Sequence, residues 1–106
     1  MELKITDNNF EEEVKKSNLP VMVDFYADWC GPCKMMAPLV AGLAESYSGK
    51  CKIGKCNTDE NPNLSREFKI MSIPTFLFFK DGKLTDTVIG AVSKNELEEK
   101  IKQVLA

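Results

Sequence analysis

The chain has 106 residues, of which 43% are hydrophobic, and its 14 basic and 16 acidic residues leave a formal net charge of −2. This length suits a single domain over residues 1–106 with a substantial core, and the apolar content excludes intrinsic disorder. The near-neutral charge argues against a nucleic-acid partner, because phosphate backbones are bound by clustered Lys and Arg in excess. The sequence contains no His, which excludes Cys-His and Ser-His catalytic pairs and His-ligated metals.

The N-terminal residues 1–4 lack the basic start and the apolar stretch of a secretory signal. No run approaches the ~18 consecutive apolar residues that a membrane-spanning helix needs. We therefore expect a cytoplasmic chain with no membrane partner, and nothing in the sequence calls for more than a monomer. In a reducing compartment, cysteines are more often catalytic, metal-bound or free than paired in structural disulfides.

Apolar spacing predicts a helix and then a buried strand near the N-terminus. A four-residue apolar repeat among acidic residues predicts a short amphipathic helix over 7–16, with Asp7 or Asn8 as its cap. The segment 21–27 is apolar on both faces except at Asp24, a pattern typical of a central, parallel-type strand.

The middle of the chain continues the alternation of helix and strand. Helical spacing runs from residue 33 to about 47, with a kink expected at Pro38. A weaker strand is predicted over 51–57. A cap at Asn61 followed by a first-turn proline predicts a helix over 62–68.

The last third reads as a hairpin followed by a helix. The segment 75–79 is predicted to be a strand, and the Asp-Gly pair at 81–82 predicts a tight turn to an antiparallel partner over 83–89. Ser93 and Glu96 form a capping box that opens a final helix. This order of elements predicts a mixed sheet covered by helices on both faces.

Cys30 and Cys33 lie between the first predicted strand and the helix that follows it. A helix N-terminus presents unpaired N–H groups and the positive end of the helix dipole, which stabilise a thiolate on Cys30. The two-residue spacing lets the sulfurs meet across one turn, so the pair can cycle between dithiol and disulfide. Gly31 and Pro32 limit the freedom of this turn, and Trp29 adds a large flat surface beside the reactive sulfur.

The other two cysteines leave a metal site open as an alternative. The spacing Cys30-x2-Cys33-x17-Cys51-x4-Cys56 is close to that of a four-cysteine zinc site. Against it, Cys51 and Cys56 fall within a predicted strand rather than in a turn. A disulfide between them is disfavoured, because five steps along a strand span roughly 16 Å and a bridge allows about 7 Å. We expect both to be small, half-buried hydrophobic residues rather than regulatory thiols.

Asp24 is a carboxylate in an otherwise apolar strand, so it is expected to be protonated or paired, with a raised pKa if its surroundings are dry. Two interpretations stay open: Asp24 pairs with a backbone group, or it accepts a proton during the dithiol chemistry. Lys55 is the candidate partner, since it lies on the strand expected beside Asp24. Pro74 precedes the strand 75–79, and an isolated proline in this place is most often trans.

The residues 29–33, Trp-Cys-Gly-Pro-Cys, together with the segment 25–34 around them, resemble the active-site segment of the thioredoxin family, and the resemblance covers essentially the whole chain. Further positions match other features of the family. Asp24 matches its buried acid, Pro38 its helix kink, and Lys55 the lysine near that acid. Asp59 with Asn61 and Pro62 matches the turn that follows, Ile73 to Thr75 the cis-proline loop, and Gly90 the glycine of the substrate groove. Tyr26 stands where many members have Trp, and Cys51 and Cys56 are not part of the family's motif.

The resemblance implies an α/β thioredoxin fold, with a central mixed sheet of four to five strands flanked by four α-helices and with a cis bond before Pro74. It also implies a protein-disulfide reductase. Cys30 attacks a client disulfide, Cys33 resolves the mixed disulfide, and Asp24, influenced by Lys55, takes the proton. These four residues form the expected catalytic set.

The resemblance implies two kinds of partner, disulfide-containing client proteins and a separate thioredoxin reductase. The chain has no glycine pattern for binding a nicotinamide or flavin, so we expect no bound cofactor beyond the redox-active disulfide, and no metal. Residues expected to bind the client surround the cysteines: Trp29, Gly31, Pro32, Ile73, Pro74, Gly90, Ala91 and Val92.

The sequence leaves three rival functions open. An oxidase or isomerase of the same fold would run the exchange in another direction, although the dipeptide between the cysteines and the cytoplasmic character favour reduction. The fold could instead serve as a non-catalytic binding module. The zinc module is the third.

Overall fold

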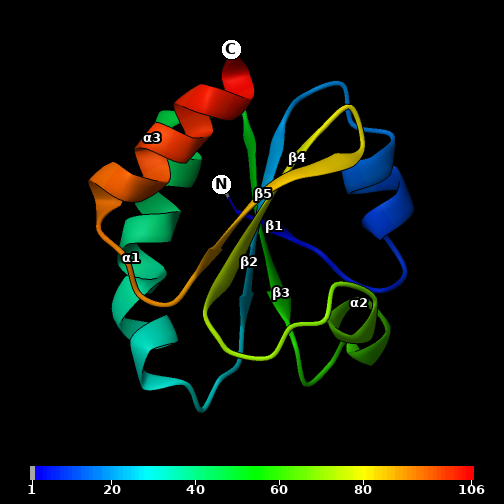
Figure 1. Ribbon diagram of the computed structural model, residues 1–106, viewed down its shortest axis with the longest axis vertical. Helices are drawn as coiled ribbons and strands as arrows, with labels where there is room; N and C mark the ends of the chain where they lie inside the picture. Colours follow the sequence, from blue (N-terminus) through cyan, green and yellow to red (C-terminus); the bar gives the residue numbers. More distant parts are fainter. Residues whose placement is uncertain (1) are drawn as a thin grey trace.

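The strand β2 (Val21–Tyr26) is the central member of a five-stranded mixed sheet in the computed structural model, which describes residues 2–106. The strand order is β1-β3-β2-β4-β5 (Figure 1). β2 pairs in parallel with β3 (Lys52–Asn57) and antiparallel with β4 (Thr75–Lys80). The edge strands are β1 (Leu3–Lys4) and β5 (Lys83–Ile89). The predicted mixed sheet with a buried central strand is confirmed.

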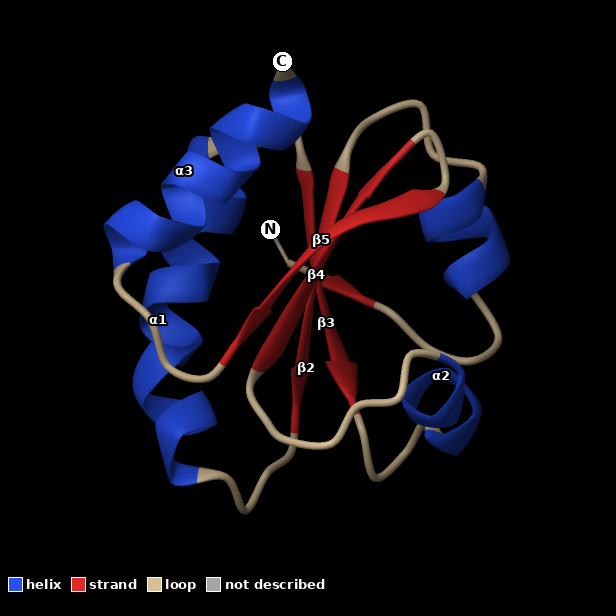
Figure 2. Cartoon of the chain, in the orientation of Figure 1, coloured by secondary structure: helices blue, strands red, loops and turns tan. Residues whose placement is uncertain are grey.

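Four helices over residues 2–106 cover the two faces of this sheet. Figure 2 shows α1 (Gly31–Ser46) and α3 (Lys94–Leu105) together on one side, and η1 (Glu11–Lys15) and α2 (Pro62–Glu67) on the other. The first of them, η1, is a single π-helical segment rather than an α-helix. Among the described residues, no helix is both long and apolar enough to cross a membrane.

Alternation along β2 and β4 divides the core into two halves. Met22, Phe76 and Phe78 pack under α1 and α3, whereas Val23 and Leu77 pack under η1 and α2. Because side chains alternate between faces along a strand, Asp24 falls on the same face as Met22, under α1. The fold therefore holds this carboxyl group inside the half of the core that α1 covers.

The turn and cap predictions in the second half of the chain are confirmed. Asp81 and Gly82 have φ values of +53° and +78°, as a two-residue hairpin turn between β4 and β5 requires. Ser93 caps α3, and its hydroxyl oxygen accepts a hydrogen bond from the Glu96 amide at 3.2 Å. Pro38 lies inside α1.

The expected cap of the first helix, Asp7 or Asn8, is wrong. Thr6, not Asp7 or Asn8, accepts hydrogen bonds at the turn that leads into η1. Its hydroxyl oxygen accepts from the backbone amides of Asn8 and Asn9. The side chain of Asn9 accepts in return from the Thr6 amide at 2.7 Å. The carboxylate of Asp7 is directed away from this turn, to a helix more than fifty residues further along the chain.

Asn61 is the N-cap residue of α2, as predicted, but its side chain makes no cap hydrogen bond, and the carboxylate of Asp7 takes that role. Its two carboxylate oxygens accept from the amides of Asn63 and Leu64 at 3.2 and 2.9 Å. The amide side chain of Asn61 turns instead to the backbone, accepting from Asp7 N at 2.8 Å and donating to Asn57 O at 2.9 Å. A negative charge at this helix N-terminus is also favoured by the helix dipole.

We expect Asp7→Ala to lower the free energy of unfolding by about 1 kcal/mol, because two amides at the start of α2 lose their acceptor. Urea unfolding of the oxidised protein measures this change. Asn8→Ala is the matched control, since Asn8 is an exposed neighbour. Equal loss in the two variants would contradict the assignment of the cap to Asp7.

Candidate functional site

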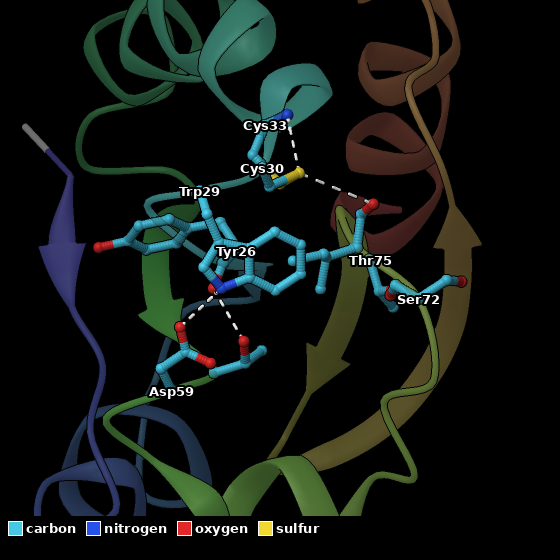
Figure 3. The surroundings of a disulfide bond; sticks show 9 residues. Tyr26, Trp29, Cys30, Cys33, Asp59, Ser72 and Thr75 are labelled. Atoms are coloured by element: carbon cyan, nitrogen blue, oxygen red, sulfur yellow. Dashed lines mark hydrogen bonds between the residues drawn. A yellow bond between two sulfur atoms is a disulfide. The ribbon is translucent and has the colours of Figure 1, made fainter.

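Cys30 and Cys33 lie at the junction of β2 and α1. Cys30 is the N-cap of α1 and has extended backbone angles, and Pro32 lies in the first turn, where its missing N–H costs nothing. The amide of Cys33 donates a hydrogen bond to Cys30 Sγ at 3.2 Å. The two sulfurs form a disulfide across a Cα–Cα distance of 5.2 Å (Figure 3). The expected pairing is confirmed, and the structure is that of the oxidised chain.

The disulfide is largely buried by the residues around it. Ala27, Cys30 and Cys33 form a small buried cluster, against which half-buried Tyr26 and Ile73 pack. Cys30 Sγ lies 3.9 Å from the carbonyl oxygen of Ile73. Cys30 is only 4% exposed and Cys33 only 6% exposed. A second molecule that reacts with Cys30 must therefore dock closely against the surrounding surface.

Trp29 forms a highly exposed part of that surface, with 71% of the residue open to solvent. Its indole N–H donates to a carboxylate oxygen of Asp59 at 2.8 Å, which fixes the ring beside the disulfide (Figure 3). Asp59 follows β3, and nothing in the sequence indicated this contact because thirty residues separate the partners. Gly31 and Pro32 are exposed at the start of α1.

The loop before β4 lies against the disulfide, and the bond between Ile73 and Pro74 is cis, as the family resemblance implied. The Pro74 carbonyl oxygen accepts a hydrogen bond from the Gly90 amide at 2.8 Å. Gly90 has φ +92°, a conformation that favours glycine, and no atom would obstruct an added Cβ there. Ala91 is exposed, whereas half-buried Val92 packs against the core under α1 and α3.

Asp24 is a buried carboxyl group in the middle of β2. The residue is 6% exposed, and Oδ1 has no partner among residues 2–106. Its pKa is raised from 3.8 to about 7, first because burial disfavours the charged form, and then because of the nearby charge of Glu2; the charge of Lys55 opposes the rise. The interpretation of Asp24 as a group paired with the backbone is not supported at Oδ1.

Lys55 is placed as the sequence suggested, directly opposite Asp24 in the parallel pairing of β2 and β3. Its side chain is exposed, with the ammonium 5.8 Å from the centre of the Tyr26 ring. Lys55 therefore acts on Asp24 through its charge. The influence of Glu2 was missed, because it lies just before β1, and the two residues of that strand leave no alternating pattern in the sequence.

The remaining cysteines are free, buried and far from forming a zinc site. Cys51 belongs to the half of the core under α1 and α3, and Cys56 to the opposite half. Burial raises the pKa of Cys51 to about 11 and that of Cys56 to about 12. Over residues 2–106, no three Cys, Asp or Glu side chains approach closely enough to hold a metal ion. The four-cysteine arrangement that the spacing allowed therefore does not form.

A cysteine pair that closes into a disulfide at a helix N-terminus defines a thiol-disulfide oxidoreductase. Comparison with known proteins agrees, since the family model described as Thioredoxin matches residues 2–103. The chain belongs to the thioredoxin family of oxidoreductases, whose redox-active pair here is Cys30 and Cys33.

Three of the similar proteins show how far the likeness extends. The thioredoxin of Porphyra purpurea is 48% identical over 103 residues, which cover 97% of this chain and 96% of that protein. Thioredoxin 1 of Synechococcus elongatus is 53% identical over 93 residues, 88% of this chain and 87% of the relative. The chloroplastic M-type thioredoxin of Pisum sativum is 50% identical over 101 residues, 95% of this chain and 59% of the relative.

Asp24→Asn is expected to remove the decrease in the free energy of unfolding that the wild-type chain shows as the pH rises. The native chain holds the Asp24 proton up to about pH 7, whereas the unfolded chain releases it near pH 4, so wild-type stability falls as the pH rises between these values. Asn carries no charge. The stability of the variant relative to wild type should therefore rise by roughly 2–3 kcal/mol between pH 5 and pH 8.

Urea unfolding of the oxidised proteins at several pH values measures this effect. Asp28→Asn is the matched control, because it removes an exposed carboxylate from the same segment. Parallel pH profiles for wild type and Asp24→Asn would contradict the raised pKa, and a large loss of stability at pH 8 would make Asp24 a structural residue.

We expect Cys30 and the two core cysteines, Cys51 and Cys56, to differ in alkylation of the reduced chain. At pH 7, iodoacetamide should modify Cys30 first, because a helix amide stabilises its thiolate. Cys51 and Cys56 should resist until the chain unfolds, since both are buried with pKa values of about 11 and 12. Mass spectrometry of peptides from a pH series measures the order. Identical pH profiles at Cys30 and Cys51 would contradict the role of the helix N-terminus.

Proposed function

We propose that this chain is a protein-disulfide reductase, which delivers two electrons to disulfides in client proteins through Cys30 and Cys33. The observation that carries the proposal is the hydrogen bond from the Cys33 amide to Cys30 Sγ at the start of α1. In the reduced chain the same amide and the positive end of the helix dipole stabilise a thiolate, which is the nucleophile of disulfide exchange.

The exchange proceeds in two balanced steps. The Cys30 thiolate attacks one sulfur of the client disulfide; a bond forms between Cys30 and that sulfur, and the other client sulfur leaves as a thiolate that takes up a proton. Cys33 then attacks Cys30 Sγ, and the second client sulfur leaves in the same way. The client is reduced by two electrons, and the chain is left with the disulfide that the structure contains.

Asp24 is proposed to receive the proton that Cys33 releases in the second step. Its pKa of about 7 suits this role, because a group that titrates near neutrality both accepts and returns a proton there. A cavity of about 310 Å³, lined in part by Tyr26, Ala27 and Cys33, offers space for water beside the Cys33 thiol. Lys55 favours the return of the proton, since its charge opposes the rise in the Asp24 pKa.

The client is proposed to dock as an extended segment on the surface around the disulfide. Trp29 and Ile73 supply apolar area, and the backbone beside Pro74 supplies polar groups for pairing with the segment. Gly31 and Pro32 on one side, and Gly90, Ala91 and Val92 on the other, complete the proposed contact.

A separate reductase is proposed to return electrons to the disulfide, and the chain needs no bound cofactor or metal for the exchange. The free thiols of Cys51 and Cys56 fit a reducing compartment, for which we propose the cytoplasm, and a role in electron transport and redox balance there. We propose that the chain acts as a monomer, without a nucleic-acid or membrane partner; the formal net charge of −2 supports the former exclusion.

Reduction of a protein disulfide such as that of insulin is expected to depend on Cys30 and Cys33 in different ways. Cys30→Ser should abolish activity, because it removes the attacking sulfur. Cys33→Ser should still attack but fail to resolve, so that a covalent complex with the client accumulates. Insulin turbidity and non-reducing electrophoresis measure the two effects, and Cys51→Ser is the control that should keep activity.

Two outcomes would contradict the proposed function. Activity that survives Cys30→Ser would show that the reduction does not occur at this site. A reduction potential of the Cys30–Cys33 pair near the roughly −120 mV of strongly oxidising thiol-disulfide proteins would mean that electrons flow from client to chain.

A further inference from the structure

Exposed large hydrophobic residues are concentrated on one stretch of surface, which runs from beside the disulfide along the edge strand β5. Four of the six that occur in residues 2–106 line two neighbouring cavities. These four are Trp29 at 71%, Met71 at 92%, Leu84 at 47% and Ile89 at 65% exposed. The other two, Met35 and Leu105, lie on α1 and α3 and line neither of these cavities. Clustered exposed apolar groups mark interaction sites more reliably than scattered ones do.

The first cavity, about 190 Å³, lies beside the disulfide and is lined by residues that include Trp29, Met71 and Ile73. This cavity adjoins the docking surface already proposed for the client. It reaches the loop between α2 and β4, which Figure 1 shows running across the end of the sheet.

The second cavity, about 120 Å³, lies between that loop and the outer face of β5, and we call it the β5 groove. The segment 68–72 forms one wall, and Leu84, Thr87 and Ile89 form the other. In the pairing with β4 these three residues lie opposite Phe79, Leu77 and Thr75, on the face that η1 and α2 cover nearer the centre of the sheet. At the edge strand the apolar side chains remain exposed.

The two cavities adjoin and share three lining residues. Ile70, Met71 and Ser72 border both of them, so one hollow surface leads from Trp29 to Leu84. Of the ten residues described around the β5 groove, Lys69 is the only charged one. The groove is therefore apolar with one positive charge at its wall, and a flexible methionine side chain connects it to the disulfide.

We propose that the β5 groove is a second binding site for the client, which holds an apolar side chain with an acidic neighbour several residues from the attacked cysteine. This inference rests on the proposed function and adds a determinant of client choice to it. The apolar side chain buries against Leu84 and Ile89, and the acidic neighbour faces Lys69. Continuity with the cavity beside Cys30 argues for the same client segment as occupant.

Two peptides test the proposal. Both contain one intramolecular disulfide and an identical extended tail; one tail carries Leu-Glu and the other Ser-Ser. Moving the pair from three to seven residues beyond the nearer cysteine covers spans of about 10 to 23 Å at ~3.3 Å per residue. We measure kcat/KM for each peptide, with the chain kept reduced by a chemical dithiol.

The Leu-Glu peptide at its best position should be reduced about fivefold faster in kcat/KM than the Ser-Ser peptide, the size expected for partial burial of one leucine. Leu84→Ser should remove this advantage and leave the Ser-Ser peptide unaffected, and Leu84→Met should restore it. Leu105→Ser is the matched control, because it removes another exposed leucine remote from both cavities, and it should keep the advantage.

Three results would overturn the proposal. One is equal kcat/KM for the two peptides at every position, and another is equal loss of the advantage in Leu84→Ser and Leu105→Ser. The third is a dimer in sedimentation that Leu84→Ser dissociates, which would assign the groove to a second copy of the chain. In each case reduction of the Ser-Ser peptide continues, whereas failure to reduce either peptide would contradict the proposed function itself.

Discussion

The hydrogen bond from the Cys33 amide to Cys30 Sγ is the interaction on which the site depends. It exists because the buried strand β2 ends immediately before α1 begins, so that Cys30 caps the helix and its sulfur meets the first free amides. Pro32 can occupy the first turn without the loss of a hydrogen bond. The central position of β2 in the sheet then fixes where this helix N-terminus stands relative to the loop of Pro74. The reactive sulfur is thus placed by the most buried part of the fold and activated by backbone groups that would otherwise be unsatisfied.

Asp24 lowers the stability of the fold when it is ionised, although its carboxyl group suits the proposed chemistry. A carboxyl group in this position lowers stability whenever it ionises, since burial is the main cause of its raised pKa. Burial raises this pKa most, the charge of Glu2, just before β1, raises it further, and the charge of Lys55 on the adjacent strand β3 opposes the rise, which leaves the pKa at about 7. Local rules are most often broken at functional sites, where another requirement compensates. A carboxyl group is also one of the few proton acceptors open to a chain that contains no His.

Much of this arrangement could be predicted from the sequence, because long apolar runs and cap signals are local. The central strand, the hairpin at Asp81 and the capped final helix followed from spacing within a few residues. The N-cap position of α2 at Asn61 was local as well, but the acceptor for its first amides could not be found in this way, since Asp7 reaches amides 56 and 57 residues away. The contact of Trp29 with Asp59 and the influence of Glu2 on Asp24 could not be predicted for the same reason, because each joins residues that are far apart in the sequence. The cis bond before Pro74 came from the family resemblance alone, because an isolated proline more often predicts the trans form.

The four cysteines show how position rather than residue type decides reactivity in this chain. Cys30 has a helix amide at its sulfur and Cys33 lies one turn away, so these two can exchange a disulfide. Cys51 and Cys56 are surrounded by the core, and the loss of solvent keeps both as thiols far above neutral pH. A chain that handles disulfides has to prevent its own spare thiols from attacking the mixed disulfide. Burial on opposite faces of the sheet achieves this separation, because neither sulfur can approach Cys30 without unfolding the half of the core that contains it.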